Sequence, residues 1–261
     1  TGPGGTFGPY TADVHKDTVR YNSIIFNGPS DIKGTVYLSK WYYDQKKFPE
    51  LVGYVPAFKR VRKFPTNQRF EPLVPGLTMY LSDAWAAGDP FLTWGNYKIV
   101  GRGPLLGAVS QNHMSHPNWV PGVHGGPQNQ TFWDIDMELV PECIVVDAEP
   151  TSYPRAPYSK KRVWFDVRNM MYMNMTTYDR RGEIFKNFEP SYGLYEKGNN
   201  RRMTGNNTTW SWNTVMSHDM QSNRMSRFVQ TQDTAGVKSV MNAEGLYEKY
   251  MTESAISRLG S

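Results

Sequence analysis

Residues 161–188 read KRVWFDVRNMMYMNMTTYDRRGEIFKNF, and this stretch decides the fold class. It contains three strand-like segments that are rich in β-branched and aromatic residues. The turn Asp179–Gly182 separates the last two segments, and Gly182 suits the positive φ that a tight hairpin turn requires. The three segments, 161–168, 170–178 and 183–188, therefore predict an antiparallel meander.

Outward from this stretch, short strand-like segments alternate with turns rich in glycine and proline. Trp133–Leu139 alternates strictly between apolar and acidic residues, which is typical of a half-buried strand. Residues 101–130 are expected to form a long loop, and residues 239–259 show the helical spacing of a C-terminal helix. The sequence thus predicts a mainly β fold, with about ten strands in an antiparallel sheet, long loops and a C-terminal helix. The remaining predicted elements are strands at 19–27, 35–43, 51–56, 58–64, 91–100, 143–148, 210–216 and 227–231, and a helical turn at 83–88.

Composition divides the chain into three parts. Residues 1–18 are rich in Gly, Pro and Thr and are expected to be a loose lead-in. Residues 19–196 are expected to form the β domain. Residues 197–261 begin with a polar spacer and continue with late strands and the C-terminal helix, which we expect to pack on the sheet.

Composition also excludes several classes of protein. No apolar stretch approaches the roughly 20 residues that a membrane-spanning helix needs. The single cysteine, Cys143, excludes an internal disulfide framework and a CxxC metal site. It lies in the apolar run ECIVVDA, which favours inert packing over nucleophilic catalysis. The 29 basic and 24 acidic residues give a net charge of only +5, so we expect no nucleic-acid partner.

Two polar groups between residues 101 and 138 suit metal binding or acid–base catalysis. Three carboxylates share one face of the predicted strand 133–139, and they either form a site or simply a solvated outer face. Three histidines lie in the long loop, but their spacing matches no helical zinc motif, so we expect neither a metal nor a cofactor. The chain contains no nucleophile elbow, dinucleotide fingerprint or Walker loop. The three carboxylates are Asp134, Asp136 and Glu138, and the three histidines are His113, His116 and His124.

Four cations lie within five residues of the predicted strand 58–64. Lys59, Arg60, Arg62 and Lys63 interrupt Phe58, Val61 and Phe64. Such a segment suits a phosphate, a lipid headgroup or an acidic partner. The alternative is a charged outer strand that discourages edge-to-edge aggregation.

Three methionines predict a deformable apolar wall. Met171, Met173 and Met175 alternate along one strand and therefore share one face of the sheet. Inside a curved sheet this face would line the site of a variable hydrophobic ligand. The alternative is ordinary core beneath the C-terminal helix. If the methionines are core, we expect the ligand nearer to Trp94, Tyr97 and Trp133.

Several segments resemble a known bacterial family. Residues 54–63, YVPAFKRVRK, are similar to its Y-x-P-x-x-R-R-V-R-R strand pair. Residues 158–165, YSKKRVWF, followed by residues 178–185, YDRRGEIF, resemble its second hallmark, in which a strand after Y-x-K-R leads into a Y-D-x-x-G-x-L hairpin. Residues 82–101 are similar to the intervening segment. The colinear match over residues 19–190 resembles the periplasmic outer-membrane lipoprotein-sorting-like family (domain of unknown function 1329).

The resemblance implies a half-barrel, a curved antiparallel sheet closed partly by helix as in the periplasmic lipoprotein carriers. It also implies a periplasmic or outer-membrane-associated location. Members are encoded near transporters and outer-membrane β-barrels, which implies traffic of hydrophobic molecules with one of these as partner. Members have a longer N-terminal region, which implies a processed or trimmed form here. The family has no established catalytic residues, so none are assigned.

Three functions follow from these observations. The first is a periplasmic carrier of a lipid or other hydrophobic molecule, held by apolar burial on the concave face of the sheet. The second is a hydrolase-type enzyme that uses the histidines and carboxylates of residues 101–138. The third is a non-catalytic partner of an outer-membrane transport complex that docks through Lys59 to Lys63.

Overall fold

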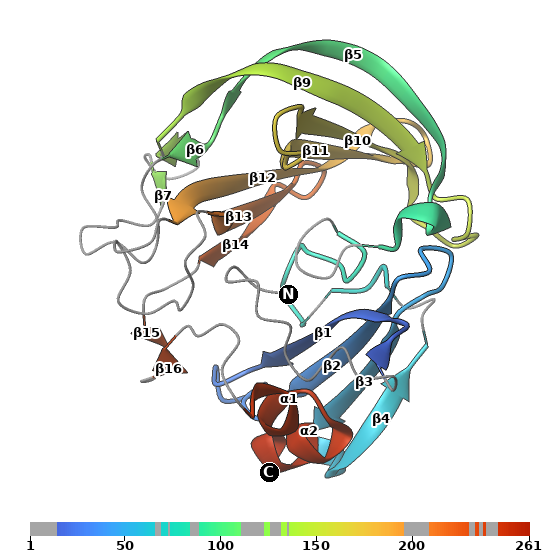
Figure 1. The fold of residues 1–261 in the computed structure, drawn as a ribbon, viewed down its shortest axis with the longest axis vertical. Helices are drawn as coiled ribbons and strands as arrows, with labels where there is room; N and C mark the ends of the chain where they lie inside the picture. Colours follow the sequence, from blue (N-terminus) through green and yellow to red (C-terminus); the bar gives the residue numbers. More distant parts are fainter. Residues whose placement is uncertain are drawn as a thin grey trace. The chain divides into compact units, whose positions relative to one another are not determined.

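A computed structural model describes most of the chain, which divides into two compact units (Figure 1). The first, which we call the curved-sheet unit, consists of residues 1–6, 96–150 and 157–241. The second, the helix–sheet unit, consists of residues 7–95, 151–156 and 242–261. The residues that the structure describes are 15–65, 69–72, 74–83, 89–110, 123–125, 132–134, 136–195, 209–229, 233–234, 237–238 and 245–261.

The curved-sheet unit is built on one large sheet in the order β14-β13-β12-β11-β10-β9-β5. Neighbouring strands from β9 to β14 all pair antiparallel, and the short β6 pairs parallel with β12. Two further pairs, β7 with β8 and β15 with β16, form small separate sheets. The bounds are β5 Gly95–Gly107, β6 Val109–Ser110, β7 Val123–Gly125, β8 Phe132–Asp134, β9 Glu138–Glu149, β10 Tyr158–Asp166, β11 Tyr172–Asp179, β12 Ile184–Tyr195, β13 Thr209–Asp219, β14 Arg224–Val229, β15 Asp233–Thr234 and β16 Val237–Lys238.

The large sheet is strongly curved, as the arched β5 and β9 show (Figure 1). After β5, the chain continues into β6, where Val109 pairs with Tyr192 on β12. The Tyr192 backbone N–H also donates to the carbonyl oxygen of Ala108 at 2.8 Å. The chain that leaves β5 therefore pairs again with β12 through β6, while β14 is the edge strand at the other end of the strand order.

Cross-strand rows distinguish the two faces of the curved sheet, because directly opposed residues point to the same side. One row is buried along most of its length, and it places Met175 between Val163 and Phe188. The adjacent row on the other face is mainly polar. The buried row is Val146, Val163, Met175, Phe188, Ser217 and Ser226, and the polar row is Asp147, Arg162, Thr176, Asn187, His218 and Met225.

The polar row is joined by hydrogen bonds. Arg162 donates to both oxygens of Asp147, at 2.7 and 2.9 Å, and Lys160 donates to the same carboxylate at 2.8 Å. The hydrogen bonds from Arg162 hold the pKa of Asp147 below its usual value. Thr176 donates to Asn187 at 3.1 Å. These polar side chains thus satisfy one another, and the buried row on the other face packs mainly through apolar side chains.

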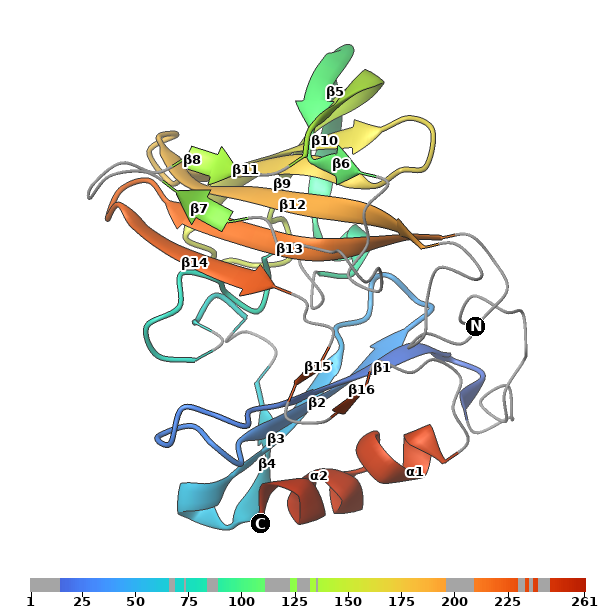
Figure 2. The ribbon, with the colours of Figure 1, turned by 90° about the vertical axis from the view of Figure 1, so that its left-hand side faces the viewer.

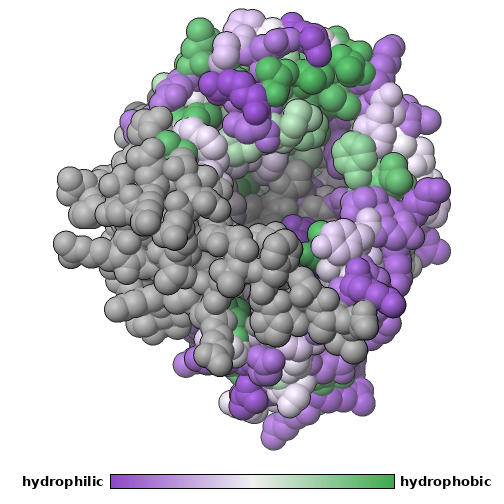
Figure 3. All heavy atoms as spheres, in the orientation of Figure 1, coloured by the Kyte–Doolittle hydropathy of each residue, from purple (hydrophilic) through white to green (hydrophobic). Residues whose placement is uncertain are grey.

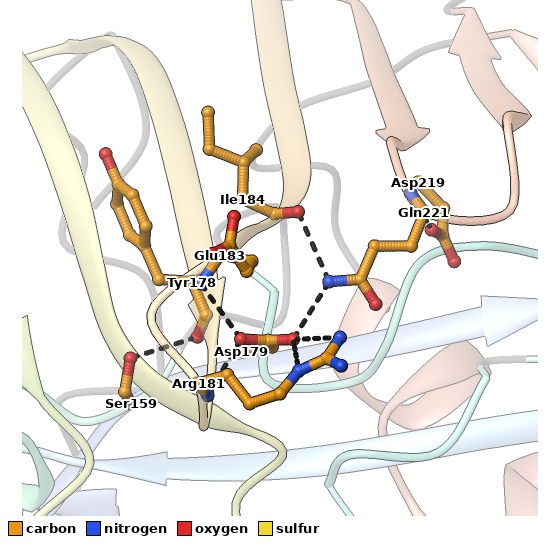
Figure 4. Close-up of polar contacts among 8 residues, drawn as sticks. All are labelled: Ser159, Tyr178, Asp179, Arg181, Glu183, Ile184, Asp219 and Gln221. Carbon is orange, nitrogen blue, oxygen red and sulfur yellow. Dashed lines mark hydrogen bonds and ion pairs between the residues drawn. The ribbon is translucent and has the colours of Figure 1, made fainter.

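The turn between β11 and β12 is held by one carboxylate (Figure 4). Asp179 accepts the backbone N–H groups of Arg181 and Glu183, at 2.9 and 3.0 Å, and the side-chain N–H of Gln221 at 3.0 Å. Desolvation raises the pKa of Asp179, but these hydrogen bonds outweigh it and lower the pKa to about 2. Gly182 has φ 87°, so both the predicted turn and its glycine are confirmed.

The helix–sheet unit contains a four-stranded antiparallel sheet in the order β1-β2-β3-β4. The helices α1 and α2 lie along this sheet (Figure 2). Ile256 of α2 is fully buried against Val36, Leu38 and Val52. The bounds are β1 Thr18–Ile25, β2 Val36–Tyr42, β3 Glu50–Val55, η3 Pro56–Phe58, β4 Arg60–Phe64, η5 Phe91–Thr93, α1 Leu246–Tyr250 and α2 Glu253–Gly260.

A buried ion pair fixes the segment between β4 and η5. Arg69 donates to the carboxylate of Asp89 at 2.5 Å, and their side chains are 5% and 0% exposed. Asp89 also accepts the indole N–H of Trp94 at 2.8 Å, and Arg69 donates to the Leu81 carbonyl oxygen at 3.2 Å. The described residues between β4 and η5 are therefore tied to the unit by charge-assisted hydrogen bonds.

The mainly β fold with a curved, open antiparallel sheet is confirmed, although its strands are divided between two sheets. No helix in the described part of the chain has the length and apolar character to cross a membrane. The domain boundaries predicted at residues 18 and 196 stay predictions.

Three predicted elements are wrong in detail. The strand predicted at 91–100 is a 3-10 turn followed by β5, which runs through the predicted loop as far as Gly107. Its pairing with β9 overrides the glycines, and Pro104 is tolerated because β5 ends the strand order. The single strand predicted at Trp133–Leu139 is also wrong, because β8 ends at Asp134 and pairs with β7, and β9 begins at Glu138.

The single helix predicted over residues 239–259 is replaced by two short helices in the described residues. The chain leaves α1 after Tyr250, and Thr252 takes an extended conformation before α2. The Thr252 side chain accepts the backbone N–H of Ala255 at 3.0 Å. A threonine that caps a new helix cannot also continue the preceding one, which explains the break.

Candidate functional site

An apolar cluster occupies the end of the curved sheet at which β6 returns to β12. Its buried members come from β6, β9, β11 and β12, and half-buried side chains pack around them. We call this group the methionine–tryptophan cluster. Its buried residues are Val109, Val140, Cys143, Met173 and Tyr192, and its half-buried residues are Leu105, Trp164, Met171, Trp210 and Trp212.

A β-bulge places Met173 in this cluster. Trp164 pairs with Asn174 and Phe165 pairs with Tyr172, so Met173 has no partner across β10. Such a bulge re-aims side chains relative to the regular alternation. Gly107 leaves the room that Met173 needs, because a Cβ at Gly107 would lie 3.2 Å from the methionine sulfur. The backbone irregularities thus shape the site.

The cluster has no charged side chain among its ten members. Burial raises the pKa of the Cys143 thiol and raises the pKa of the Tyr192 phenol well above its usual range. The Tyr192 hydroxyl donates to the Tyr172 carbonyl oxygen at 2.9 Å. Cys143 is therefore a neutral, packed thiol rather than an activated nucleophile. The cluster offers apolar contact and little else.

The half-buried tryptophans are the residues that sequence reasoning missed. Trp164, Trp210 and Trp212 each leave part of a large ring accessible at the margin of the cluster. Trp210 and Trp212 are two residues apart on β13, so strand alternation alone would have placed them on one face. Large rings beside flexible methionines suit contact with an apolar molecule of variable shape.

The three predicted methionines do not have equivalent surroundings. Met173 is 4% exposed within the cluster, and Met171 is half-buried at its margin just before β11. Met175 is 1% exposed and packs in the buried row of the sheet. Only Met171 therefore leaves appreciable surface to contact a further molecule. Their predicted role in ligand binding stays a prediction.

The aromatic residues predicted as an alternative ligand site fall in different places. Trp94 is 2% exposed in the helix–sheet unit and packs against Tyr153, with ring centres 5.9 Å apart. Tyr97 belongs to β5 of the curved-sheet unit and is 37% exposed. Trp133 lies on β8, and its side chain is outside the described part. These residues also stay predictions as ligand contacts.

A cavity of about 220 Å³ lies in the helix–sheet unit, between the C-terminal helices and the four-stranded sheet. It falls below the roughly 300–1,000 Å³ that drug-sized ligands occupy. Sequence patterns cannot reveal this cavity, because it depends on where α1 and α2 dock. Its lining residues are Tyr21, Leu38, Lys40, Glu50, Val52, Tyr247, Met251, Thr252 and Glu253.

The polar side of this cavity is organised around Glu50. Glu50 accepts a hydrogen bond from the Tyr42 hydroxyl and lies 3.7 Å from the ammonium of Lys63. The Tyr42 hydrogen bond lowers the pKa of Glu50, and burial together with that bond raises the pKa of Tyr42. Glu50 therefore remains ionised and already has partners on two sides.

The predicted basic segment forms the edge strand β4 and the turn before it. Lys59, Arg60, Arg62 and Lys63 are all exposed. Phe58 is 51% exposed, and the Arg62 guanidinium lies 4.0 Å from its ring centre. The segment is thus an exposed cationic edge, as the sequence predicts, and its contact with a headgroup or partner stays a prediction.

Exposed apolar side chains gather on β5 and at the start of β9, where the space-filling view is hydrophobic near the top (Figure 3). Leu139 and Met137 are exposed, so the half-buried strand predicted at Trp133–Leu139 is also wrong for the burial of these two residues. They lie beyond the strand pairing of β8 and at the first residues of β9. The exposed set is Tyr97, Ile99, Val100, Leu106, Met137 and Leu139.

The proposed polar sites of residues 101–138 fall largely outside the described residues. His113 and His116 lie outside them, and the side chains of His124 and Asp134 are not described. Asp136 and Glu138 are exposed. Among the described residues, no three His, Cys, Asp or Glu side chains are grouped to hold a metal. The prediction of an enzyme site there has no further support from the structure.

The comparison with protein families establishes the family of this chain. A family model described as protein of unknown function (DUF1329) matches residues 8–257. The chain belongs to this family. The resemblance drawn from residues 54–63, 158–165 and 178–185 is therefore confirmed. A search of functionally curated proteins gives no match.

Solved structures of the same fold include a DUF1329 family protein from Desulfovibrio piger. It has a TM-score of 0.54 and 16% identity, over 94% of this chain and 79% of that protein. A "putative outer membrane lipoprotein-sorting protein domain" from Vibrio parahaemolyticus has a TM-score of 0.51 and 16% identity, over 84% of this chain and 74% of that domain. At this identity the similarity establishes the fold alone.

Proposed function

We propose that this chain is a non-catalytic carrier of a lipid or other hydrophobic molecule. The observation that carries the proposal is the methionine–tryptophan cluster, in which half-buried Met171, Trp164, Trp210 and Trp212 surround a buried apolar centre. A ligand laid against these side chains would gain about 0.8 kcal/mol for each methylene removed from water. Because the cluster has no charged member, selectivity for one ligand would be loose.

We also propose a location and partners for the carrier, which rest on the family resemblance. We infer a periplasmic or outer-membrane-associated site of action, in traffic between the two membranes. The lipoprotein-sorting name of the Vibrio parahaemolyticus domain supports this inference, although it belongs to that protein. The corresponding partners would be an outer-membrane β-barrel or an inner-membrane transporter.

Of the residues predicted from the sequence, the proposal uses Met171 and Met173 as ligand contacts. Met173 would form the base beneath the ligand and Met171 part of the margin. Met175 and Trp94 are packed in cores, so their contribution would be structural. Tyr97 is accessible on β5 and would contact only a ligand that extends beyond the cluster.

Two measurements test the proposal directly. Mass spectrometry of native protein should reveal co-purified lipids or other hydrophobic molecules. Titration with a fluorescent fatty-acid probe should quench or shift the tryptophan emission, because three tryptophans border the cluster. Absence of both bound lipid and saturable probe binding would refute the carrier function.

Paired variants locate the binding site. We expect Trp212→Ala to weaken probe binding about tenfold, which corresponds to 1.4 kcal/mol. Trp212→Phe should restore part of the affinity. Met171→Ala should weaken probe binding more than its matched control, Met220→Ala. Met220 suits this control because it is 49% exposed at the β13–β14 turn of the same unit. Equal effects of the two methionine variants would place the ligand elsewhere.

A further inference from the structure

The tip of the β3–β4 hairpin is an exposed aromatic residue on a fixed turn. The 3-10 turn Pro56–Phe58 ends at Lys59, which has φ 49° and donates its backbone N–H to the Pro56 carbonyl oxygen at 3.1 Å. This turn leaves Phe58 with half of its surface in solvent. The exposed half of this side chain is available for contact with another apolar phase.

The cations beside Phe58 are largely unneutralised. Within the part of the chain that the structure describes, one of the four forms an ion pair, Lys63 with Glu50 at 3.7 Å. Within the described residues, Lys59, Arg60 and Arg62 have no carboxylate at ion-pair distance. Arg62 instead stacks on Phe58. The tip thus combines an apolar end with free positive charge.

The cations of the edge strand β4 lie on both faces of the sheet and not on one face alone. Arg60 and Arg62 are opposite Val55 and Gly53 on β3 and share one face, whereas Lys63 is opposite Val52 on the other face. A folded protein partner would meet one face of such an edge. A surface of diffuse negative charge into which the tip dips would meet both faces at once. The arrangement therefore favours a lipid surface over a protein.

The base of the hairpin is rigid enough to present this tip. Leu51, Val52 and Tyr54 of β3 are buried. The end of α2 lies so close that a Cβ at Gly260 would clash with the Tyr54 ring. A Cβ at Gly34 would likewise lie 3.0 Å from the Pro56 side chain. Close packing on both sides of the hairpin fixes its direction, so little conformational entropy is lost when the tip binds.

We propose that this hairpin tip docks the protein on an anionic phospholipid surface. Phe58 enters the interface, while Lys59, Arg60, Arg62 and Lys63 contact headgroup phosphates. Each cation near such a surface contributes about fivefold in affinity, from roughly 1 kcal/mol per Lys or Arg. The docking is independent of the cargo site, because it involves none of the cluster residues.

Vesicle co-sedimentation of the full chain at low salt tests this docking. We expect binding to phosphatidylcholine vesicles that contain phosphatidylglycerol, and little binding to phosphatidylcholine alone. Arg60→Gln with Arg62→Gln should reduce the binding about 25-fold, and added salt should weaken wild-type binding in the same way. Phe58→Ser should also weaken it while leaving the salt dependence intact.

The matched control is Lys46→Gln with Lys47→Gln, which removes two exposed charges from the β2–β3 turn at the other end of β3. We expect this variant to bind nearly as well as the wild type. An equal loss in both double variants would overturn the proposal, because binding would then follow net charge alone. Unchanged vesicle binding of the Arg60/Arg62 variant would also overturn it, and would leave the cationic edge to a protein partner.

Two further readouts keep the test decisive. The thermal midpoint of each variant shows whether it folds, and Phe58→Ser remains informative if the arginine variant does not. Affinity for the fluorescent fatty-acid probe should be unchanged in all of these variants. Loss of vesicle binding with intact probe binding therefore separates docking from cargo binding.

Discussion

The two units bury a sheet face by different means. In the helix–sheet unit, α2 covers the four-stranded sheet, and Ile256 packs on Val36, Leu38 and Val52. In the curved-sheet unit, the described residues include no helix, and the strands enclose the apolar residues by their own curvature. The first unit is closed by a separate element and the second by the shape of its sheet.

This difference separates structural from functional apolar surface. The helix-covered face borders a small cavity in which Glu50 is already paired. The curved sheet instead retains three half-buried tryptophans and Met171 around its cluster. A large apolar ligand therefore suits the curved sheet, and the cationic edge of the other sheet suits a membrane surface. The following substitutions test how separate these roles are.

Removal of the buried ion pair should have the largest effect. Asp89→Ala removes the carboxylate that pairs with the buried Arg69 guanidinium and accepts the Trp94 indole N–H. We expect a loss of about 3–5 kcal/mol in the free energy of unfolding. Chemical denaturation of the variant measures this loss. Asp31→Ala, at an exposed aspartate of the same unit, is the control. Equal stability of the two variants would mean that helix cover alone holds the helix–sheet unit.

Met175→Ala tests whether the curved sheet packs as a core without a helix. Met175 lies between Val163 and Phe188 and is almost fully buried. Emptying such a site costs about 2–5 kcal/mol. Denaturation should show this loss, while the probe affinity measured on the folded variant should change little. A stable variant with weakened probe binding would place the ligand at this row and would show that the row is not a structural core.

Local sequence patterns predicted the parts of the curved sheet in which strands that follow one another along the chain pair together. The meander of residues 161–188 was predictable because alternation and the turn at Asp179–Gly182 agree. The exposed cations of β4 were predictable because charge density at a strand resists burial. In both regions the decisive contacts are between neighbours along the chain.

The rest depends on contacts between distant residues. β5 is extended through Gly101, Gly103 and Pro104 because it pairs with β9, which no local propensity shows. The ion pair of Arg69 and Asp89 joins positions that look like ordinary loop residues. The candidate site was only partly predictable, since the methionines were visible but the tryptophans of β10 and β13 join them only through the fold.

The cap of α2 tests the helix cover with a smaller change. Thr252→Ala removes the side-chain oxygen that accepts the Ala255 N–H. We expect a loss of about 1 kcal/mol, because this is the usual cost of losing an N-cap. Thr252→Ser should retain most of the stability. Denaturation of both variants measures the difference, and equal losses would assign the effect to the lost methyl group rather than to the cap.

The smallest effect should come from the turn that holds the β11–β12 hairpin. The carboxyl of Asp179 has a pKa of about 2 in the folded chain, below the usual value of about 3.9. A lowered folded pKa means that ionised Asp179 contributes stability above pH 4 and loses it as the pH falls towards 2. Asp179→Asn should therefore reduce stability slightly at neutral pH and flatten its dependence between about pH 4 and 2. Thermal midpoints across this range measure the effect, with Asp31→Asn as a control. An unchanged acid profile would mean that strand pairing, and not this carboxylate, fixes the hairpin of the curved sheet.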